Sequence, residues 1–334
     1  MTTVGAGGRR VTIHDVADRA NVSRQTVTRA MNDMAGISSE TRQRVLDAAR
    51  SLGYRPSRFG RGLVRHDHHT LGLVISNLLN PYYPEFASAV VARAAERGWT
   101  VVLLDCSSAE DERTMINRMA DQVDALIGYI HLSRSELDRT MPGVPVVWID
   151  AGTKAENPNG VLFDLRPGLE SIADHLLSAG VHRPVMLDIG SADGPSDRAR
   201  EFVRSMAVRG VDVPVVRADG DQLEHSIETT SKIIDTMPKT DAILCFNDIM
   251  AFGALKALRA RGREVPVDVR VIGIDGLAAG TYVTPQLTSL AVDMTEVAAM
   301  AVDIALGRLD GTVPSGSRRA RRKIRHRLLV RESG

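Results

Sequence analysis

Arg24, Gln25, Thr28 and Arg29 form the group of residues whose types and spacing point most directly to a chemistry. An arginine guanidinium donates two parallel hydrogen bonds to O6 and N7 of guanine, and a glutamine amide pairs in the same way with N6 and N7 of adenine. On a helix these four positions lie on one face. The arrangement therefore suits a helix that reads base edges in the major groove of DNA. The same residues would also suit an ordinary solvated helix face, and their types alone leave both interpretations open.

Short polar side chains around this group are suited to hydrogen bonds with phosphate oxygens. They are Thr12, Ser23, Thr26, Asn32, Ser38 and Thr41. The charge distribution agrees, because residues 1–65 contain 12 Lys and Arg against 5 Asp and Glu, whereas residues 66–317 contain 22 against 35. A basic head on an acidic body favours a polyanionic partner such as nucleic acid, since neutralised phosphates release their counterions. Charge alone would also suit a basic tail that has no partner.

Three short helices are predicted to position these side chains. Thr12, with Asp15 three residues later, marks the start of the first helix. Ser23 is placed to cap the second helix and Ser38 the third, and each helix carries an apolar stripe at helical spacing. Two short helices joined by a tight turn make a helix-turn-helix. We therefore predict a helix-turn-helix DNA-binding domain over residues 11–56.

Residues 57–69 are predicted to form a hinge helix and a linker. Residues 58–65 provide about two helical turns, in which Gly60 and Gly62 each cost about 1 kcal/mol of helix propensity. We therefore expect this helix to form conditionally. The run of His66, Asp67, His68 and His69 that follows lacks further ligands for a metal and is interpreted as a polar joint.

From Thr70 onward, short apolar runs alternate with helical stretches, which is the pattern of parallel strands joined by crossover helices. The predicted strands cover residues 71–76, 100–104, 125–130, 144–149, 183–189, 242–246, 270–274 and 289–292. The predicted helices cover residues 84–96, 113–120, 166–178, 196–209, 225–237, 250–261 and 295–306, the last of them stopped by Gly307. Eight strands would stretch one sheet, so we predict two similar lobes. The expected fold class is an all-α helix-turn-helix head followed by a two-lobed α/β body with parallel sheets over residues 70–334.

Composition and motif content restrict the function classes. The 334 residues are 43% hydrophobic and 25% charged, as in an ordinary globular protein. Because no run approaches the roughly 18 apolar residues of a membrane span and no apolar export segment begins the chain, we expect a cytoplasmic protein without a membrane partner. Cys106 and Cys245 lack metal-ligand spacing, and no phosphate-binding glycine loop, nucleophile elbow or HExxH motif occurs. We expect no metal, no cofactor and no enzymatic activity.

Specific segments carry a resemblance to a known family. In the head they are residues 11–32 (VTIHDVADRANVSRQTVTRAMN), 37–46 and 52–56, and in the body they are residues 71–76, 80–83, 246–254, 265–275, 285–289 and 328–333. These segments resemble the lactose-repressor (LacI/GalR) family of transcriptional regulators. The resemblance covers nearly the whole chain from Val11.

The resemblance implies a repressor that acts as a homodimer, or as a dimer of dimers, on a near-palindromic double-stranded DNA operator. It also implies a small-molecule effector, often a sugar, bound between two lobes like those of periplasmic binding proteins, with a coupling to DNA that is reciprocal. Leu63 occupies the position of the family's hinge-helix leucine, which wedges between bases in the minor groove. Gly60 and Gly62 depart from the alanine-rich hinge of the family, and Arg24 stands where its members vary.

The same resemblance implies a set of effector contacts that combines aromatic faces with fixed polar groups. The implied residues are Ser76, Tyr82, Tyr83, Phe163, Asp164, Arg198, Asn247, Asp248 and Asp275. Each has a structural alternative: Asn247 and Asp248 would equally cap the following helix, and Asp275 would equally end its strand. Glu201 and Gly276 stand where the family often has Gly and Asp, so the ligand pattern departs from the usual one.

Two further alternatives remain at this point. The basic stretch from Arg318 to Arg327 is either an additional nucleic-acid contact or a solvated surface strand, and its resemblance to the family's last strand, residues 324–330, favours the solvated strand. The competing function class is a sugar-binding receptor without DNA function, which shares the two-lobed body. That class predicts an export signal and no basic helix-turn-helix, and the sequence departs from it on both points.

Overall fold

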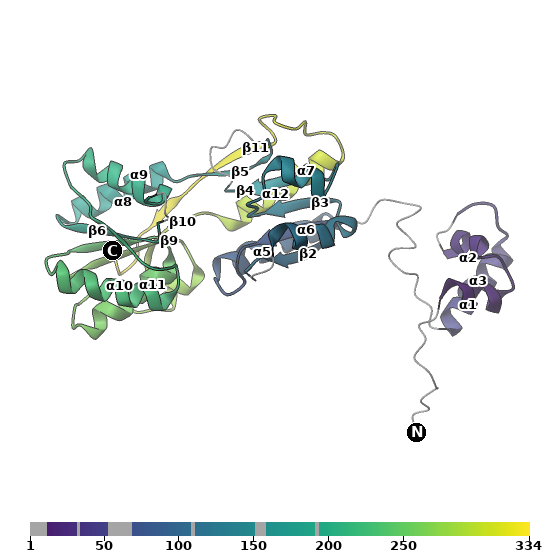
Figure 1. Cartoon of the computed structure of the whole chain (residues 1–334), viewed down its shortest axis with the longest axis horizontal. Coiled ribbons are helices and arrows are strands. Elements are labelled where there is room, and N and C mark those ends of the chain that lie inside the picture. Colours follow the sequence, from purple (N-terminus) through teal and green to yellow (C-terminus); the bar gives the residue numbers. More distant parts are fainter. Residues whose placement is uncertain (1–11, 32–33, 53–68, 108–110, 151–157, 191–193) are drawn as a thin grey trace, which may run out of the picture. The chain divides into compact units, whose positions relative to one another are not determined.

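The structure, a computed structural model, describes residues 12–31, 34–52, 69–107, 111–150, 158–190 and 194–334 (Figure 1). The chain divides into two compact units, Met1–His68 and His69–Gly334. The first is a small helical head and the second is a two-lobed α/β body. The expected fold class is therefore confirmed, and the two units are described separately.

The head consists of three helices, α1 (Ile13–Ala20), α2 (Arg24–Met31) and α3 (Ser39–Ser51). Each helix buries its apolar stripe in one shared core, which contains Val16, Val27 and Val45, all without exposed surface. The predicted caps form: Asp15 Oδ2 accepts hydrogen bonds from the backbone N and from Oγ1 of Thr12, both at 2.7 Å. A core this small is stabilised largely by these few buried side chains and caps, because short helices are marginal on their own.

The first lobe of the body is a six-stranded parallel sheet in the order β11-β5-β4-β3-β1-β2. Helices α5 and α12 cover one face around the side chains of Leu73, Ile127 and Val302, and helices α6 and α7 cover the other face around Leu126 and Trp148. The bounds are β1 (Thr70–Ile75), α5 (Tyr82–Glu96), β2 (Thr100–Asp105), α6 (Glu112–Met119), η1 (Ala120–Gln122), β3 (Ala125–Gly128), α7 (Arg134–Thr140), β4 (Val146–Ile149), β5 (Gly160–Asp164), α12 (Met294–Leu309) and β11 (Arg321–Arg325).

The second lobe repeats this plan with the sheet order β12-β10-β9-β8-β6-β7. Its strands are parallel except for β12, which pairs antiparallel with β10. The bounds are α8 (Arg166–Ser178), β6 (Pro184–Asp188), α9 (Asp197–Ala207), β7 (Val215–Arg217), α10 (Leu223–Thr236), β8 (Ala242–Cys245), α11 (Asp248–Ala260), β9 (Arg270–Asp275), η2 (Ala278–Thr281), β10 (Thr288–Ala291) and β12 (Arg327–Leu329).

The chain passes between the lobes after β5, after β10 and after β11. In Figure 1 the last passage follows the yellow strand labelled β11. The sequence predicted one strand over residues 324–330, but the structure has two, because His326 separates a strand in each lobe. Strands β5, β10 and β11 end at these passages, so their C-terminal ends lie toward the other lobe, and ligands of open α/β sheets bind at this end of the strands.

Several elements differ from the prediction. Strands β5 and β7 and helix α7 were not predicted, because they are short and their sequences carry weak periodicity. Helix α12 does not stop at Gly307, which is buried inside it, but runs to Leu309 and is followed by Gly311 in the left-handed region at φ 79°. A glycine marks a helix end where the backbone needs a positive φ, and Gly307 serves close packing against Val313 instead.

Candidate functional site

Helix α2 presents its polar side chains outward. Arg24, Gln25 and Arg29 are exposed and Thr28 is half-buried, whereas Val27 and Ala30 on the opposite face are buried in the head core. The packing of α2 therefore leaves the four predicted base-reading residues free of the core. The hydroxyl of Thr28 donates to the carbonyl oxygen of Arg24 at 3.1 Å, which ties it to the helix backbone.

The short hydroxyl side chains of the head act as helix caps. Ser23 Oγ accepts from the backbone N of Thr26 at 3.1 Å, and Ser38 Oγ accepts from the backbone N of Thr41 at 3.2 Å. Ser23 is exposed and Thr26 is half-buried, so a capping hydroxyl here still has room for a phosphate oxygen. Asn32 and Leu63 lie outside the described residues, as does most of the predicted hinge, residues 57–69.

In the body, Arg198 joins several of the predicted effector residues. It lies in the first turn of α9, which Ser196 caps through a 3.1 Å bond from the backbone N of Ala199. Its Nη1 donates to the carbonyl oxygen of Phe246 at 2.5 Å and lies 3.5 Å from Oδ1 of Asp275. The guanidinium also stands over the Phe246 ring, 4.5 Å from the centroid. These contacts hold the Arg198 head group in one place between the ends of β8 and β9.

Asp275 ends β9 with a positive φ of 133°, and its side chain is 5% exposed. Burial raises the pKa of this carboxyl to about 8, the Arg198 charge opposes the rise, and Asp248 adds to it. A strained backbone and a strongly shifted pKa at the end of a strand are features that functional sites often share.

Asn247 and Asp248 behave as the structural alternative described. Oδ1 of Asn247 accepts from the backbone N of Met250 at 2.8 Å and caps α11. Asp248 has no exposed surface and accepts from Ser289 Oγ at 2.6 Å and from the backbone N of Leu277 at 2.7 Å. Asn247 thus caps α11, and Asp248 braces the segment that follows Asp275.

The first lobe contributes a group of tyrosines. The hydroxyls of Tyr82 and Tyr129 lie 2.7 Å apart, and the rings of Tyr82, Tyr83 and Tyr129 contact one another edge to face. Burial raises the pKa of Tyr83, and a hydrogen bond with Ser76 opposes the rise. Burial and the nearby charge of Asp275 raise the pKa of Tyr82, while Arg198 lowers it, which places this tyrosine within electrostatic reach of the second lobe. We call Tyr82, Tyr83, Tyr129, Arg198, Phe246 and Asp275 the interlobe cluster.

Phe163 and Asp164 end β5 beside this cluster. The Phe163 ring meets the imidazole of His326 at a centroid distance of 5.4 Å, and Asp164 lies 4.0 Å from Arg325. His326 is 7% exposed, and burial together with the charge of Arg198 lowers its pKa to about 4. His326 and Tyr129 were not predicted, because a histidine inside a basic run and a tyrosine after an apolar strand carry no motif.

Asp150, also not predicted, follows β4 in the left-handed region with φ 53°. Although Asp150 is exposed at the surface, neighbouring groups reduce the hydration of its carboxylate and raise its pKa to about 6, and the charge of Arg198 opposes the rise. The positive φ sets Asp150 apart, but the sequence does not reveal it, because aspartate adopts this conformation without any particular residue beside it.

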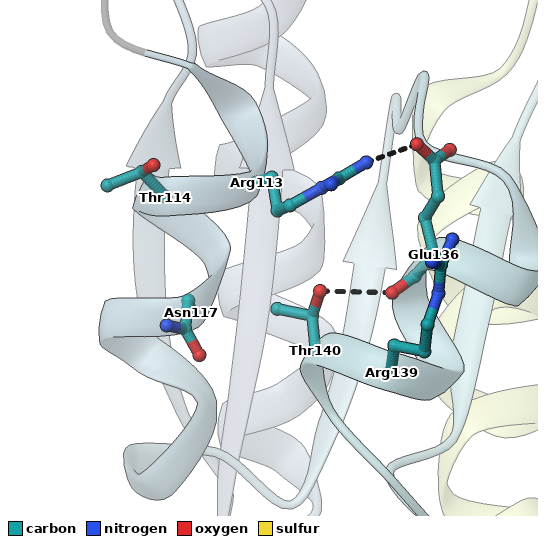
Figure 2. Close-up of a pocket in the computed structure, with 6 residues that line it drawn as sticks. All are labelled: Arg113, Thr114, Asn117, Glu136, Arg139 and Thr140. Carbon is teal, nitrogen blue, oxygen red and sulfur yellow. Dashed lines mark hydrogen bonds and ion pairs between the residues drawn. The ribbon is translucent and has the colours of Figure 1, made fainter.

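A polar pocket lies elsewhere on the first lobe, between α6 and α7 (Figure 2). It has a volume of about 320 Å³ and is lined by Arg113, Thr114, Asn117, Glu136, Arg139 and Thr140. Arg113 and Glu136 pair across it, and Thr140 donates to the Glu136 carbonyl at 3.0 Å. Because Arg113 and Glu136 already pair across the pocket, we assign it no ligand and place the candidate effector site at the interlobe cluster.

Among the described residues, neither a metal site nor a membrane-spanning helix accompanies the interlobe cluster. No group of three or more His, Cys, Asp or Glu in this part of the chain is arranged to hold a metal ion. None of the described helices is long and apolar enough to cross a bilayer.

Comparison with known proteins identifies both units. Residues 12–57 match the family model described as bacterial regulatory proteins, lacI family, and residues 173–333 match a periplasmic binding protein-like domain. The HTH-type transcriptional regulator AscG of Escherichia coli K12 is 32% identical over 311 residues, which cover 90% of this chain and 92% of that protein. The HTH-type transcriptional regulator DegA of Bacillus subtilis is 31% identical over 97% of this chain and 98% of its own length.

Solved structures agree. A LacI family transcriptional regulator from Arthrobacter sp. FB24, in complex with lactose, is 33% identical with a TM-score of 0.75, covering 79% of this chain and 98% of that one. A lac repressor dimer bound to operator and the anti-inducer ONPF is 23% identical with a TM-score of 0.80 over 97% and 99% of the two chains, which supports the fold. The chain belongs to the LacI family of DNA-binding transcriptional regulators.

Proposed function

We propose that this chain is a repressor that binds a specific operator as a homodimer and whose DNA affinity is set by a small carbohydrate bound at the interlobe cluster. Relatives support the repressor and its carbohydrate: one 29% identical protein is named a ribose operon repressor, and the Arthrobacter regulator holds lactose. In this proposal residues 11–56 bind DNA, residues 57–69 form the hinge, residues 70–334 bind effector and dimerise, and the protein acts in the cytoplasm without catalysing a reaction.

The observation that carries the DNA-binding half is the outward presentation of α2. Arg24, Gln25 and Arg29 are exposed at a helix whose other face is fully committed to the head core. Burial of Val27 and Ala30 fixes the rotation of α2, so these polar residues face away from the core together. Thr28 and the hydroxyl residues Thr12, Ser23, Thr26, Ser38 and Thr41, with Asn32, are assigned to the same interface, and Leu63 to the minor groove.

For the effector half, the support is the arrangement of the interlobe cluster. Arg198 and Asp275 from the second lobe act on Tyr82 and Tyr83 from the first, so a ligand here would contact both lobes. Ser76, Phe163 and Asp164 complete the proposed site, with Asn247 and Asp248 supporting it. A ligand that binds both lobes favours one angle between them, and the operator must then change ligand affinity by the same factor.

The test is fluorescence anisotropy of the full chain on DNA from upstream of its own gene. Arg24→Ala is expected to weaken specific binding by about 1–3 kcal/mol, the usual contribution of one base contact. Arg50→Ala is the matched control, because Arg50 is 70% exposed, belongs to the same head and pairs with Asp47 at 3.2 Å. The proposal fails if no salt-sensitive complex forms at low salt. It also fails if Arg24→Ala and Arg50→Ala weaken binding equally, on specific DNA and on random DNA alike.

The competing class, a sugar-binding receptor without DNA function, makes a different prediction for the same experiment. Such a protein would bind a carbohydrate and show no DNA complex. A complex that a carbohydrate strengthens or weakens therefore separates the two, and its direction decides whether the effector releases or promotes DNA binding.

A further inference from the structure

Positive charge is concentrated at one edge of the first lobe. Residues 318–327 contain seven Lys and Arg and no Asp or Glu, whereas residues 66–317 contain 22 Lys and Arg against 35 Asp and Glu. The exposed cations at the start of this stretch are Arg318, Arg319, Arg321 and Lys323. A basic edge on an otherwise acidic body attracts an anionic partner to that edge.

These four cations have no ion-pair partner among the described residues. The ion pair of this stretch lies farther along β11, where Nε of Arg325 is 4.0 Å from Oδ2 of Asp164. An exposed arginine without a carboxylate keeps its donors for a group outside the chain. Because a guanidinium donates two parallel hydrogen bonds to phosphate oxygens, a phosphate is a well-matched partner for it.

A buried alanine fixes the turn that carries Arg318 and Arg319. Ala320 has no exposed surface, and its backbone N donates to the carbonyl oxygen of Ser317 at 3.0 Å. The backbone N of Arg321 donates to the same oxygen at 3.1 Å as β11 begins. Since Ala320 is buried in the lobe, the two arginines before it are held on the surface of an ordered turn. An anion that binds there has to order little besides their side chains.

Protection of the sheet edge does not explain all of these charges. In the described part of the chain, β11 is the outermost strand of its sheet and pairs with β5 alone. Lysine and arginine on such a strand keep other strands from pairing with it. Lys323 serves this purpose on β11 itself, but Arg318 and Arg319 precede the strand. Their charge needs another explanation.

The N-terminal end of β11 lies at the edge of the sheet where the chain enters the body from the head. All strands of this sheet are parallel, so they begin at the same edge. β1 begins at Thr70, directly after the predicted hinge, and β11 begins at Arg321. In the sheet order β11 is four strands from β1, which corresponds to about 19 Å at the usual strand spacing. The arginines thus lie at the edge to which a DNA-bound head is tethered.

We propose that Arg318, Arg319 and Arg321 form a second DNA contact, on the body, that binds backbone phosphates of the duplex beside the operator without reading its sequence. A duplex held by the head is tethered to this edge and is a polyanion, so its phosphates match the unpaired cations in charge. The sequence alone favoured a solvated strand here, whereas the ordered turn and its position favour a contact. This contact presupposes DNA binding by the head and adds to it.

The experiment is a fluorescence anisotropy titration of the full-length chain on two duplexes at several salt concentrations. One duplex is the shortest fragment of its upstream DNA that the wild type still binds, and the other extends this fragment by one helical turn, about 10 base pairs, on each side. Arg318→Gln combined with Arg319→Gln is expected to make the salt dependence shallower on the extended duplex. The log–log slope should fall by about 1 for each lost phosphate contact, and thus by about 2 for each chain.

The same Gln pair should bind the shortest fragment like the wild type. On an extended duplex of random sequence it should lose affinity by the same factor as on the extended operator, because phosphate contacts carry no sequence information.

Two control pairs separate a local contact from other causes. Arg318→Lys with Arg319→Lys keeps both charges and should keep the salt dependence of the wild type, since lysine also binds phosphate. Arg183→Gln with Lys239→Gln removes two exposed cations from the second lobe and should leave the salt dependence unchanged.

The inference is overturned if the Gln pair at Arg318 and Arg319 keeps the wild-type salt dependence on the extended duplex, or if its effect is equally large on the shortest fragment. An equal effect of the second-lobe pair would show a response to net charge, and an equal effect of the Lys pair would show a structural one; both contradict the contact. Loss of binding to polyglutamate alone, with DNA binding intact, would identify an acidic protein as the partner instead. Recognition by α2 is measured separately with Arg24→Ala and stands in each case.

Discussion

Replacement of Asp275 by Asn is expected to make the protein more stable and less responsive at the same time. Burial raises the pKa of Asp275 from 3.8 to about 8, so the folded chain binds a proton here that the unfolded chain does not hold at neutral pH. At about 1.4 kcal/mol for each pH unit between the unfolded pKa and pH 7, this protonation costs folding about 4 kcal/mol at pH 7. Asn needs no proton, and its Oδ1 can still accept from Arg198. After allowing for a weaker contact with Arg198, we expect a gain of about 2 kcal/mol at pH 7.

The sign of the pH dependence follows from the same pKa. Because it is higher in the folded state than in the unfolded state, the contribution of Asp275 to the stability of the wild-type chain falls as pH rises from about 4 to about 8. The gain from Asp275→Asn should therefore be largest near pH 8 and vanish near pH 4.

Calorimetry of the wild type, Asp275→Asn and the control Asp138→Asn at pH 4, 6 and 8 tests this, because it resolves stability differences of ~1 kcal/mol. Asp138 is an exposed aspartate of α7 that pairs with Arg134. Sugar titration of the same samples should show weaker binding by Asp275→Asn alone, since stabilising a functional residue usually costs function. The reasoning is wrong if the three melting profiles stay parallel across this range, or if Asp275→Asn lowers the melting temperature at pH 8.

Three smaller predictions concern packing, capping and charge. Gly273→Ala should destabilise the second lobe by about 1–3 kcal/mol in thermal melts, because its Cβ would lie 2.0 Å from Oδ1 of Asp248. Asn247→Ala should lower stability by about 1 kcal/mol through loss of the α11 cap, and Asn247→Asp should recover most of it, whereas equal effects of the two would argue against a capping role. The exposed cations of β11 are neutralised by Arg321→Gln, Lys323→Gln and Arg325→Gln. If this strand is only solvated, the salt dependence of operator binding should stay unchanged in anisotropy titrations, whereas a shallower dependence of affinity on salt would identify a DNA contact.

The head was largely predictable because its determinants are local. Caps such as Thr12 with Asp15, and apolar residues at helical spacing such as Val27 and Ala30, act within one or two turns of the chain. The rotation of α2 then follows from which side chains are apolar, and with it the exposure of Arg24 and Gln25. Whether these residues contact DNA is a question of binding, and that assignment stays a prediction.

Most strands of the body were also predicted, since strands covered on both faces read as continuous apolar runs. The failures have physical causes. β5 is short and only its first two residues are buried, and β11 consists mainly of arginine and lysine on a sheet edge, where one strand needs few apolar residues. Neither strand shows an alternation of apolar and polar residues that would distinguish it from a loop. For Asn247 and Asp248 the family resemblance implied ligand contacts, and the structure shows the alternative roles of a cap and a brace.

By itself the sequence determined most of the helices and strands, the three-helix head and its charge, and the resemblance to the family, because these depend on neighbouring residues and on long matching segments. Tertiary structure alone decided which residues meet at the interlobe cluster. Tyr129, Asp150 and His326 come from the ends of separate strands and act together with Arg198 and Asp275 because parallel strands bring their C-terminal ends to one edge. The pKa shifts there depend on burial and on distances between residues far apart in the chain, and no local pattern records either quantity.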